Sequence, residues 1–213
     1  YSLADIATLI ILGKSLKEQG ITEVYPKEKD RWYVKVPAFS FSKLNDLDAY
    51  LSPEMKSTGE AIGYDKKLTR AIYKALIASG MNVANYGTIL VSIADKDKEE
   101  ALPLIRRFYQ LGFNIEATEG TAKFLRSHNI KTRIKQKLSS GSTEILTSIR
   151  QGHVNYVMST RDVDIASQQT DGYKIRRCAV ENNVTMFTAL DTVKVLLDVL
   201  EEITMGVSTI DAQ

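Results

Sequence analysis

The clearest strand in this chain leads directly into a helix start, over Thr88-Ile-Leu-Val-Ser-Ile-Ala-Asp-Lys-Asp-Lys98. Further on, Ala117-Thr-Glu-Gly-Thr121 ends a second strand in a Gly/Thr turn that opens another helix. One turn offers a cation, and the other offers hydroxyls and free backbone N–H groups, which together suit a phosphate group. These two turns predict a site for a small anion, most simply a nucleotide, with no evident catalytic machinery beside it.

From Thr88 onward, strands and helices alternate. The predicted strands are 88–94, 112–117, 130–136, 154–159 and 184–187, and the predicted helices are 98–110, 121–128, 143–151, 173–182 and 189–202. Such alternation implies βαβ units around a parallel sheet. The predicted fold class is therefore α/β, with a doubly wound five-stranded parallel sheet formed by residues 88–213.

The residues before this domain predict less structure. Helices are expected at 5–19 and 66–78, a strand at 31–41 and an irregular segment at 42–64. Pro37 places that strand at an edge or at a bulge. One strand and two helices are too few to close a core, so we expect residues 1–80 to be an incomplete α+β unit. A linker is expected at 81–87, and the chain is expected to be a piece of a longer protein.

Composition excludes several classes of function. The net charge of +2 demands neither nucleic acid nor a membrane surface, and we expect neither partner. The single cysteine, Cys178, excludes an internal disulfide, fits a cytoplasmic location and is expected to be buried. His128 and His153 lack partners at metal-ligand spacing, so no metal site is expected. The common nucleotide-binding and hydrolase motifs are absent.

Anion-binding residue types follow four successive strands. Lys98 opens a helix in which Asp97 and Glu100 resemble a capping box. Taken one at a time, these residues have ordinary explanations, such as a solvated lysine or a helix cap. Thr121 is expected to cap the next helix. The carboxyl edge of an open α/β sheet is where ligands bind, however, so their convergence favours an anion site. The residues involved are Lys98, Thr118, Gly120, Thr121, Lys135, Lys137, Ser159 and Thr160.

Arginines on the fourth helix of this series are expected to be structural. Arg176 and Arg177 are predicted to lie at the surface, paired with Asp171 or Glu181.

The runs ILVSIADKDKEEA, LGFNIEATEGTAKFL, VMST and IRRCA resemble the methylglyoxal-synthase-like regulatory domain of the carbamoyl phosphate synthetase large subunit. The upstream run VKVPAFSFSKLNDLDAYLSPEMKSTGEAIG resembles the end of that subunit's second ATP-grasp unit. The resemblance implies a parent enzyme that makes carbamoyl phosphate for pyrimidine and arginine synthesis, using ATP, Mg2+ or Mn2+ and a glutaminase small subunit. The family's ATP-binding and metal-binding residues lie mainly upstream, so this piece should have no activity alone.

The resemblance also implies a strand order of 3-2-1-4-5 and a bound nucleotide effector. That effector is UMP as an inhibitor or, in some members, IMP or phosphoribosyl pyrophosphate as an activator. Ser159 stands where the family commonly has Asn, and Arg161 where it has a small polar residue, so the nucleotide is left open. The implied phosphate-binding residues are Lys98, Thr118, Thr121 and Lys137, and the implied nucleotide-binding residues are Ser159, Thr160, Ile145, Asp171 and Ile175.

Other outcomes remain open. Ornithine activates some members, but Val36 and Met186 stand where an acidic and a polar residue would hold its ammonium group, so we expect no ornithine binding. Methylglyoxal synthase itself needs carboxylates to move protons, and after the fourth strand only Asp162 and Asp164 are near. The domain could instead be structural, mediating homo-oligomer contacts around a vestigial nucleotide site.

Overall fold

The computed structural model describes residues 2–23, 28–40, 49, 54–160 and 170–205. Arg161, Asp162 and Asp164, which enter the predictions above, lie outside these residues, as does part of the predicted irregular segment.

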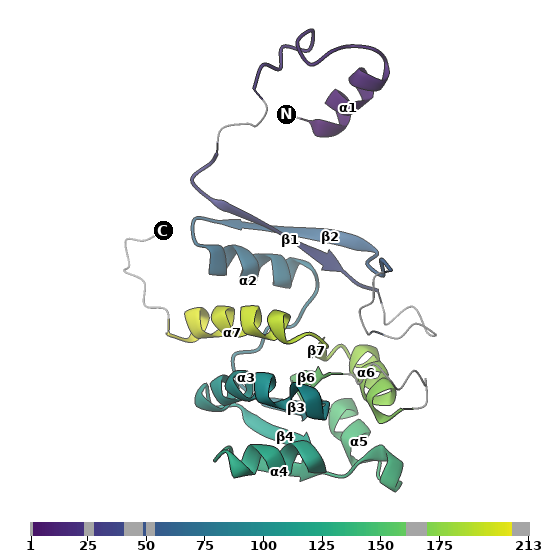
Figure 1. Ribbon diagram of the computed structural model, residues 1–213, viewed down its shortest axis with the longest axis vertical. Coiled ribbons are helices and arrows are strands. Elements are labelled where there is room, and N and C mark those ends of the chain that lie inside the picture. Colours follow the sequence, from purple (N-terminus) through teal and green to yellow (C-terminus); the bar gives the residue numbers. More distant parts are fainter. Residues whose placement is uncertain (1, 24–27, 41–48, 50–53, 161–169, 206–213) are drawn as a thin grey trace.

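A five-stranded parallel sheet forms the centre of the molecule (Figure 1). Its order is β5-β4-β3-β6-β7, which is 3-2-1-4-5 when the strands are counted within the sheet, so the predicted fold class and strand order are confirmed. The strands are β3 (Thr88–Ser92), β4 (Asn114–Thr118), β5 (Thr132–Lys135), β6 (Tyr156–Ser159) and β7 (Thr185–Phe187).

Helices cover both faces of this sheet. They are α3 (Lys98–Gln110), α4 (Glu119–Ser127), α5 (Glu144–Arg150), α6 (Asp171–Glu181) and α7 (Leu190–Met205), with short 3-10 turns η2 (Asp95–Asp97) and η3 (Leu138–Ser140). Ile89 and Val91 of β3 pack with α3, α4 and α7, whereas Leu90 packs with α5 and α6. A strand buried on both faces reads as a continuous apolar run, which is why the sequence pattern of β3 was clear.

An antiparallel hairpin precedes the sheet. It pairs β1 (Trp32–Ala38) with β2 (Gly59–Asp65), and α2 (Leu68–Ala78) packs against both strands. The prediction that 42–64 is irregular is wrong for β2. The strand was missed because glycine is uncommon in strands. Gly63 is required here because a Cβ would lie 2.2 Å from Ala71 O and 2.4 Å from Ala75 N. The glycine permits close approach of α2 and does not break the strand.

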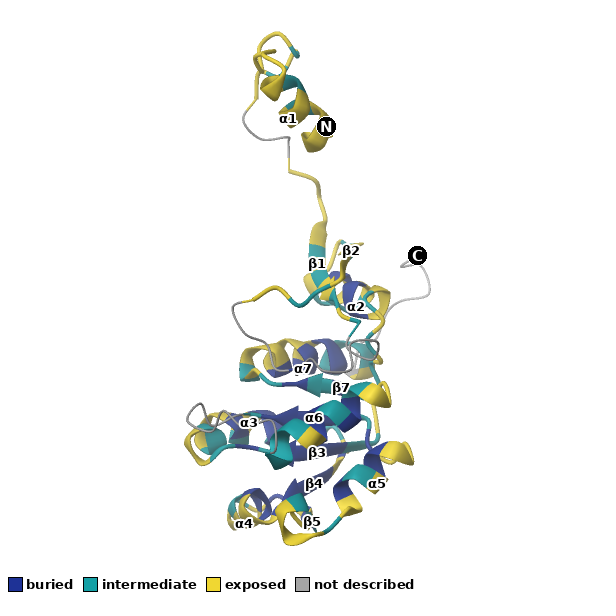
Figure 2. Ribbon diagram, turned by 90° about the vertical axis from the view of Figure 1, so that its right-hand side faces the viewer, coloured by how far each residue is buried: buried dark blue, intermediate teal, exposed yellow. Residues whose placement is uncertain are grey.

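The first helix, α1 (Leu3–Ile11), is shorter than the predicted 5–19. Its end is set by Gly13, which adopts a positive φ of 92° just beyond the C-cap Leu12. No residue of α1 is buried, and Figure 2 colours the helix as exposed and intermediate.

Residues 81–87 run from α2 to β3 along the amino ends of the strands. Tyr156 Oη donates a hydrogen bond to Ala84 O at 2.7 Å, and Thr185 Oγ1 donates one to Asn82 O at 2.8 Å. Leu76 of α2 belongs to the same apolar cluster as the sheet, and α7 lies between α2 and the sheet (Figure 1). Among the described helices, none is long and apolar enough to cross a membrane.

Candidate functional site

The turn between β3 and α3 is held from both sides. Ile93 N donates to Thr121 Oγ1 at 3.4 Å, and Ala94 N donates to Thr160 Oγ1 at 2.9 Å. The strand order reverses at β3, whose neighbours are β4 on one side and β6 on the other. Thr121 and Thr160 therefore meet at the switch point of the sheet, where ligands bind in folds of this kind.

Lys98, the first residue of α3, reaches the start of α4. Its Nζ donates to Gly120 O at 3.3 Å and pairs with Asp95 Oδ1 at 2.6 Å. The hydrogen bond from Lys98 lowers the pKa of Asp95, and the charge of Lys137 lowers it further. The two lysines predicted to bind phosphate thus act on one carboxylate at the site.

Lys137 is exposed at the start of η3. Its charge also contributes to the lowered pKa of Glu119, where the larger cause is the hydrogen bond from Lys123. The charge of Lys137 therefore acts on carboxylates of both the β3–α3 turn and the first turn of α4.

Asp97 is the N-cap residue of α3, as predicted, but the predicted capping hydrogen bond does not form among the described residues, and the cap predicted for α4 is wrong. Asp97 ends η2 with helical backbone angles, φ −97° and ψ −4°, and makes no capping hydrogen bond among the described residues, because a capping side chain needs an extended backbone. Thr118, not Thr121, is the N-cap residue of α4, and its hydroxyl bonds to Thr121 Oγ1 at 3.4 Å. No side chain among the described residues caps α4, and uncapped N–H groups in the first turn of a helix suit an anion.

Ser159 ends β6 beside a buried arginine. Its hydroxyl is buried and has no hydrogen-bond partner within the described part of the chain. Arg176 was predicted to be at the surface, but it is only 2% exposed, so that prediction is wrong. A Cβ on Gly172 would lie 3.1 Å from Arg176 Nη1 and 4.0 Å from Ser159 Oγ, so the glycine makes room for both groups.

Helical spacing could have revealed this arginine. Position 176 lies four residues after Gly172 and three before the buried Ala179, on the inward side of α6. Arg177 behaves as predicted and pairs with Glu181 at 2.8 Å.

The remaining predicted residues divide into core and rim. Ile145 and Ile175 are fully buried in the apolar cluster under α5 and α6, and Cys178 lies in the same cluster as expected. Asp171 is at the rim, where its Oδ2 accepts a hydrogen bond from Ser139 N at 3.0 Å. The structure therefore brings the polar residues to one edge and leaves the two isoleucines beneath it.

Lys135 is buried and structural, unlike Lys137. Its Nζ lies 2.9 Å from Glu144 Oε1, 3.0 Å from Ser148 Oγ and 3.4 Å from Glu116 Oε2. This network ties β5 to β4 and α5.

An apolar cavity of about 640 Å³ lies between the hairpin unit and the β7–α7 end of the sheet. Val36 and Met186, the positions considered for ornithine, both line it, and Asp191 adds a carboxylate.

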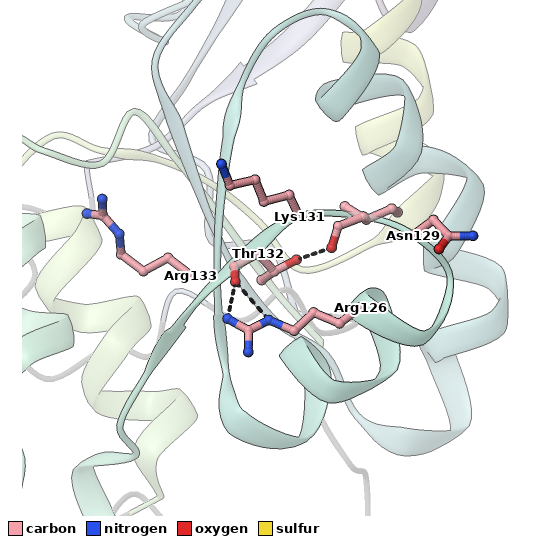
Figure 3. A pocket seen from close by; sticks show the side chains of 6 residues that line it. Arg126, Asn129, Lys131, Thr132 and Arg133 are labelled. Atoms are coloured by element: carbon pink, nitrogen blue, oxygen red, sulfur yellow. Dashed lines mark hydrogen bonds between the residues drawn. The ribbon is translucent and has the colours of Figure 1, made fainter.

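A second cavity, of about 630 Å³, lies where α4 leads into β5 (Figure 3). Arg126 donates from Nε and Nη2 to Thr132 O at 3.1 and 2.6 Å, while Lys131 and Arg133 extend in different directions. Cations along an edge strand discourage pairing with another chain, so these residues protect the edge of β5 and do not converge on a ligand.

Part of this chain resembles known proteins. Residues 100–188 match the family model of the MGS-like domain. The methylglyoxal synthase from Elizabethkingia anophelis NUHP1 is similar with a TM-score of 0.47 and 18% identity, over 54% of this chain and 79% of that chain. A structure of ForH is similar with a TM-score of 0.40 and 16% identity, over 57% of this chain and 81% of that chain. The family match spans α3 to β7, and so includes Thr118, Thr121, Lys137, Ser159 and Thr160.

Proposed function

We propose that this chain is the effector-binding region of a carbamoyl phosphate synthetase large subunit, and that its MGS-like domain binds a phosphorylated nucleotide such as UMP or IMP. The observation that carries the proposal is the convergence of Lys98, Thr121 and Thr160 on the turn after the central strand. The sequence runs quoted above support the parent enzyme.

The phosphate would bind at the start of α4. Lys98 and Lys137 supply two cations there, and Thr118 and Thr121 supply hydroxyls beside the first N–H groups of the helix. Charge-assisted hydrogen bonds of this type are about twice as strong as neutral ones. The sugar and base would lie toward Ser159, whose buried hydroxyl has no partner among the described residues and is a group that a ligand can use.

The catalytic functions of the parent belong elsewhere. ATP, Mg2+ or Mn2+ and the glutaminase small subunit would bind outside this region, in a cytoplasmic enzyme of pyrimidine or arginine synthesis. The effector would act by a coupling free energy of about 1–3 kcal/mol between its own site and the catalytic units. Val36 and Met186 offer no charge to an ammonium group, which supports the expectation that ornithine does not bind, while Asp191 in the same lining is the carboxylate that would have to hold it if it did.

Calorimetric titration with UMP, IMP and phosphoribosyl pyrophosphate tests the proposal. Lys98→Ala or Lys137→Ala should weaken binding by about tenfold or more, because each removes a charge-assisted bond of roughly 1.5–3 kcal/mol. Lys131→Ala, an exposed lysine in the α4–β5 cavity, is the matched control and should leave binding unchanged. If a folded sample binds none of the three ligands, the site is vestigial and a structural role is favoured.

One observation favours a second candidate, a methylglyoxal synthase. Asp95 places a carboxylate beside Lys98, at a position that sequence reasoning did not count. The hydrogen bond from Lys98 lowers the pKa of Asp95, however, which makes it a weaker general base. Formation of methylglyoxal from dihydroxyacetone phosphate, lost in Asp95→Asn, would establish the enzyme in place of the regulatory domain.

A further inference from the structure

The loop at 136–143 joins β5 to α5 and carries Lys137. An ion pair closes its base, with Lys135 Nζ 2.9 Å from Glu144 Oε1. Leu138 packs against the apolar cluster under α5 and α6. These two anchors fix the ends of the loop and one side of it.

A third contact holds the loop from another element. Ser139 N donates to Asp171 Oδ2 at 3.0 Å, and Asp171 is the first residue of α6. The N-cap of α6 is Thr170, whose hydroxyl accepts from Tyr173 N at 3.3 Å. The carboxylate of Asp171 is therefore not needed as the helix cap and is engaged by the loop.

We propose that Asp171 is a positioning residue, which holds the backbone of Ser139 and thereby keeps Lys137 directed at the phosphate site. The proposal rests on the proposed function and adds to it. Asp171 would act through the loop at 136–143, in place of the direct nucleotide contact that the family resemblance implies.

If Asp171 acted only through its charge, its removal would change phosphate affinity in the opposite direction. Removing a carboxylate near an anion site strengthens anion binding, because it removes a repulsion. A positioning role requires that loss of the carboxylate weaken binding. The direction of the change therefore separates the two explanations.

The experiment measures binding of inorganic phosphate from the amide NMR signals of Gly120 and Thr121. Asp171→Ala should weaken binding by about threefold to tenfold, bounded by the loss in Lys137→Ala. Asp171→Asn keeps an oxygen that can accept from Ser139 N, and should retain binding. In a Lys137→Ala background, Asp171→Ala should cause no further loss, because its effect passes through Lys137.

Asp191→Ala is the matched control, since it removes an acid from the first turn of α7 without touching the loop. The proposal is overturned if Asp171→Ala binds phosphate as tightly as the wild type or more tightly. It is equally overturned if Asp171→Asn is as weak as Asp171→Ala, or if the loss persists without Lys137. Where the wild type binds no inorganic phosphate, the same variants are measured with UMP, IMP and phosphoribosyl pyrophosphate, and a wild type that binds none of these overturns the proposed function and this proposal together.

Discussion

Lys98 already has an anionic partner at the site. The side chain of Asp95 is 93% exposed and that of Lys98 only 16%, so the carboxylate can turn away into solvent while the lysine stays in place. Lys137 also acts on this carboxylate. Under the proposed function, the phosphate would replace Asp95 as the partner of Lys98, and binding would be an exchange of one anion for another.

Asp95→Asn should therefore tighten binding of UMP or inorganic phosphate. Exposed ion pairs are weak because water and salt screen them, so the gain should be about fivefold at most. Asp97→Asn removes the same charge two positions along the same turn and is the control. Calorimetry that finds equal gains in the two variants would show a general charge effect and no specific exchange.

The places of three polar residues in the fold could be predicted from chain order alone. Lys98, Thr121 and Thr160 each follow a strand of a parallel sheet, so their meeting at one edge is dictated by topology. The sequence predicted Asp97 correctly as the N-cap residue of α3 but predicted a capping bond that does not form, because the turn η2 changes the backbone that such a bond requires. The surface position predicted for Arg176 was wrong because a charged side chain is usually exposed, whereas its place on the inward side of α6 buries it.

At the scale of elements, β2 depends on a glycine that a strand pattern would not contain. Gly63 faces α2 so closely that a side chain would collide with backbone atoms of that helix. Gly59, in the same strand, has only Ala38 Cβ at 3.9 Å, an ordinary contact. Alternating strands and helices could be read from apolar runs, but close approach of two elements is a tertiary property that a single sequence does not display.

Gly63→Ala should destabilise the protein by roughly 1–3 kcal/mol or more, as overpacking does. Gly59→Ala should be close to neutral, because its methyl group finds space. Urea unfolding of the two variants checks this pair. Equal losses in both would show that glycine flexibility, and not contact with α2, is what β2 requires.

The link between β2 and α2 should also depend on pH. A hydrogen bond from Lys74 and one from Lys67 N lower the pKa of Asp65 from 3.8 to about 2. The stabilisation that Asp65 gives the folded state is therefore fully present above the pKa of the unfolded chain, 3.8, and is lost as the pH falls through the pKa of the folded protein, about 2. Asp65→Asn should remove this loss between pH 4 and pH 2, measured as the urea midpoint against pH; an unchanged slope would contradict the assignment.

At the scale of the whole molecule, the hairpin unit and the sheet share one core. Leu76 of α2 packs with the sheet residues, and Lys67 pairs with Glu202 of α7 at 3.2 Å. Tyr156 and Thr185 hold the connecting segment against the strands. The two parts should therefore unfold together.

Trp32 is the one tryptophan of the chain, and it lies in β1. Its fluorescence and the far-ultraviolet circular dichroism should change at the same urea midpoint. Leu76→Ala should lower both midpoints equally, with a cost of about 2–5 kcal/mol. Separate transitions would show that the hairpin unit folds independently of the sheet.

The central claim is that a phosphorylated ligand binds at the turn after the central strand. The most direct test is amide NMR of the labelled chain, titrated with UMP, IMP and phosphoribosyl pyrophosphate. We predict that at least one ligand shifts the signals of Ile93, Ala94, Gly120 and Thr121 most strongly, and that Lys137→Ala suppresses these shifts. Shifts centred on Lys131 and Arg133, or no shifts with any of the three ligands, would contradict the claim.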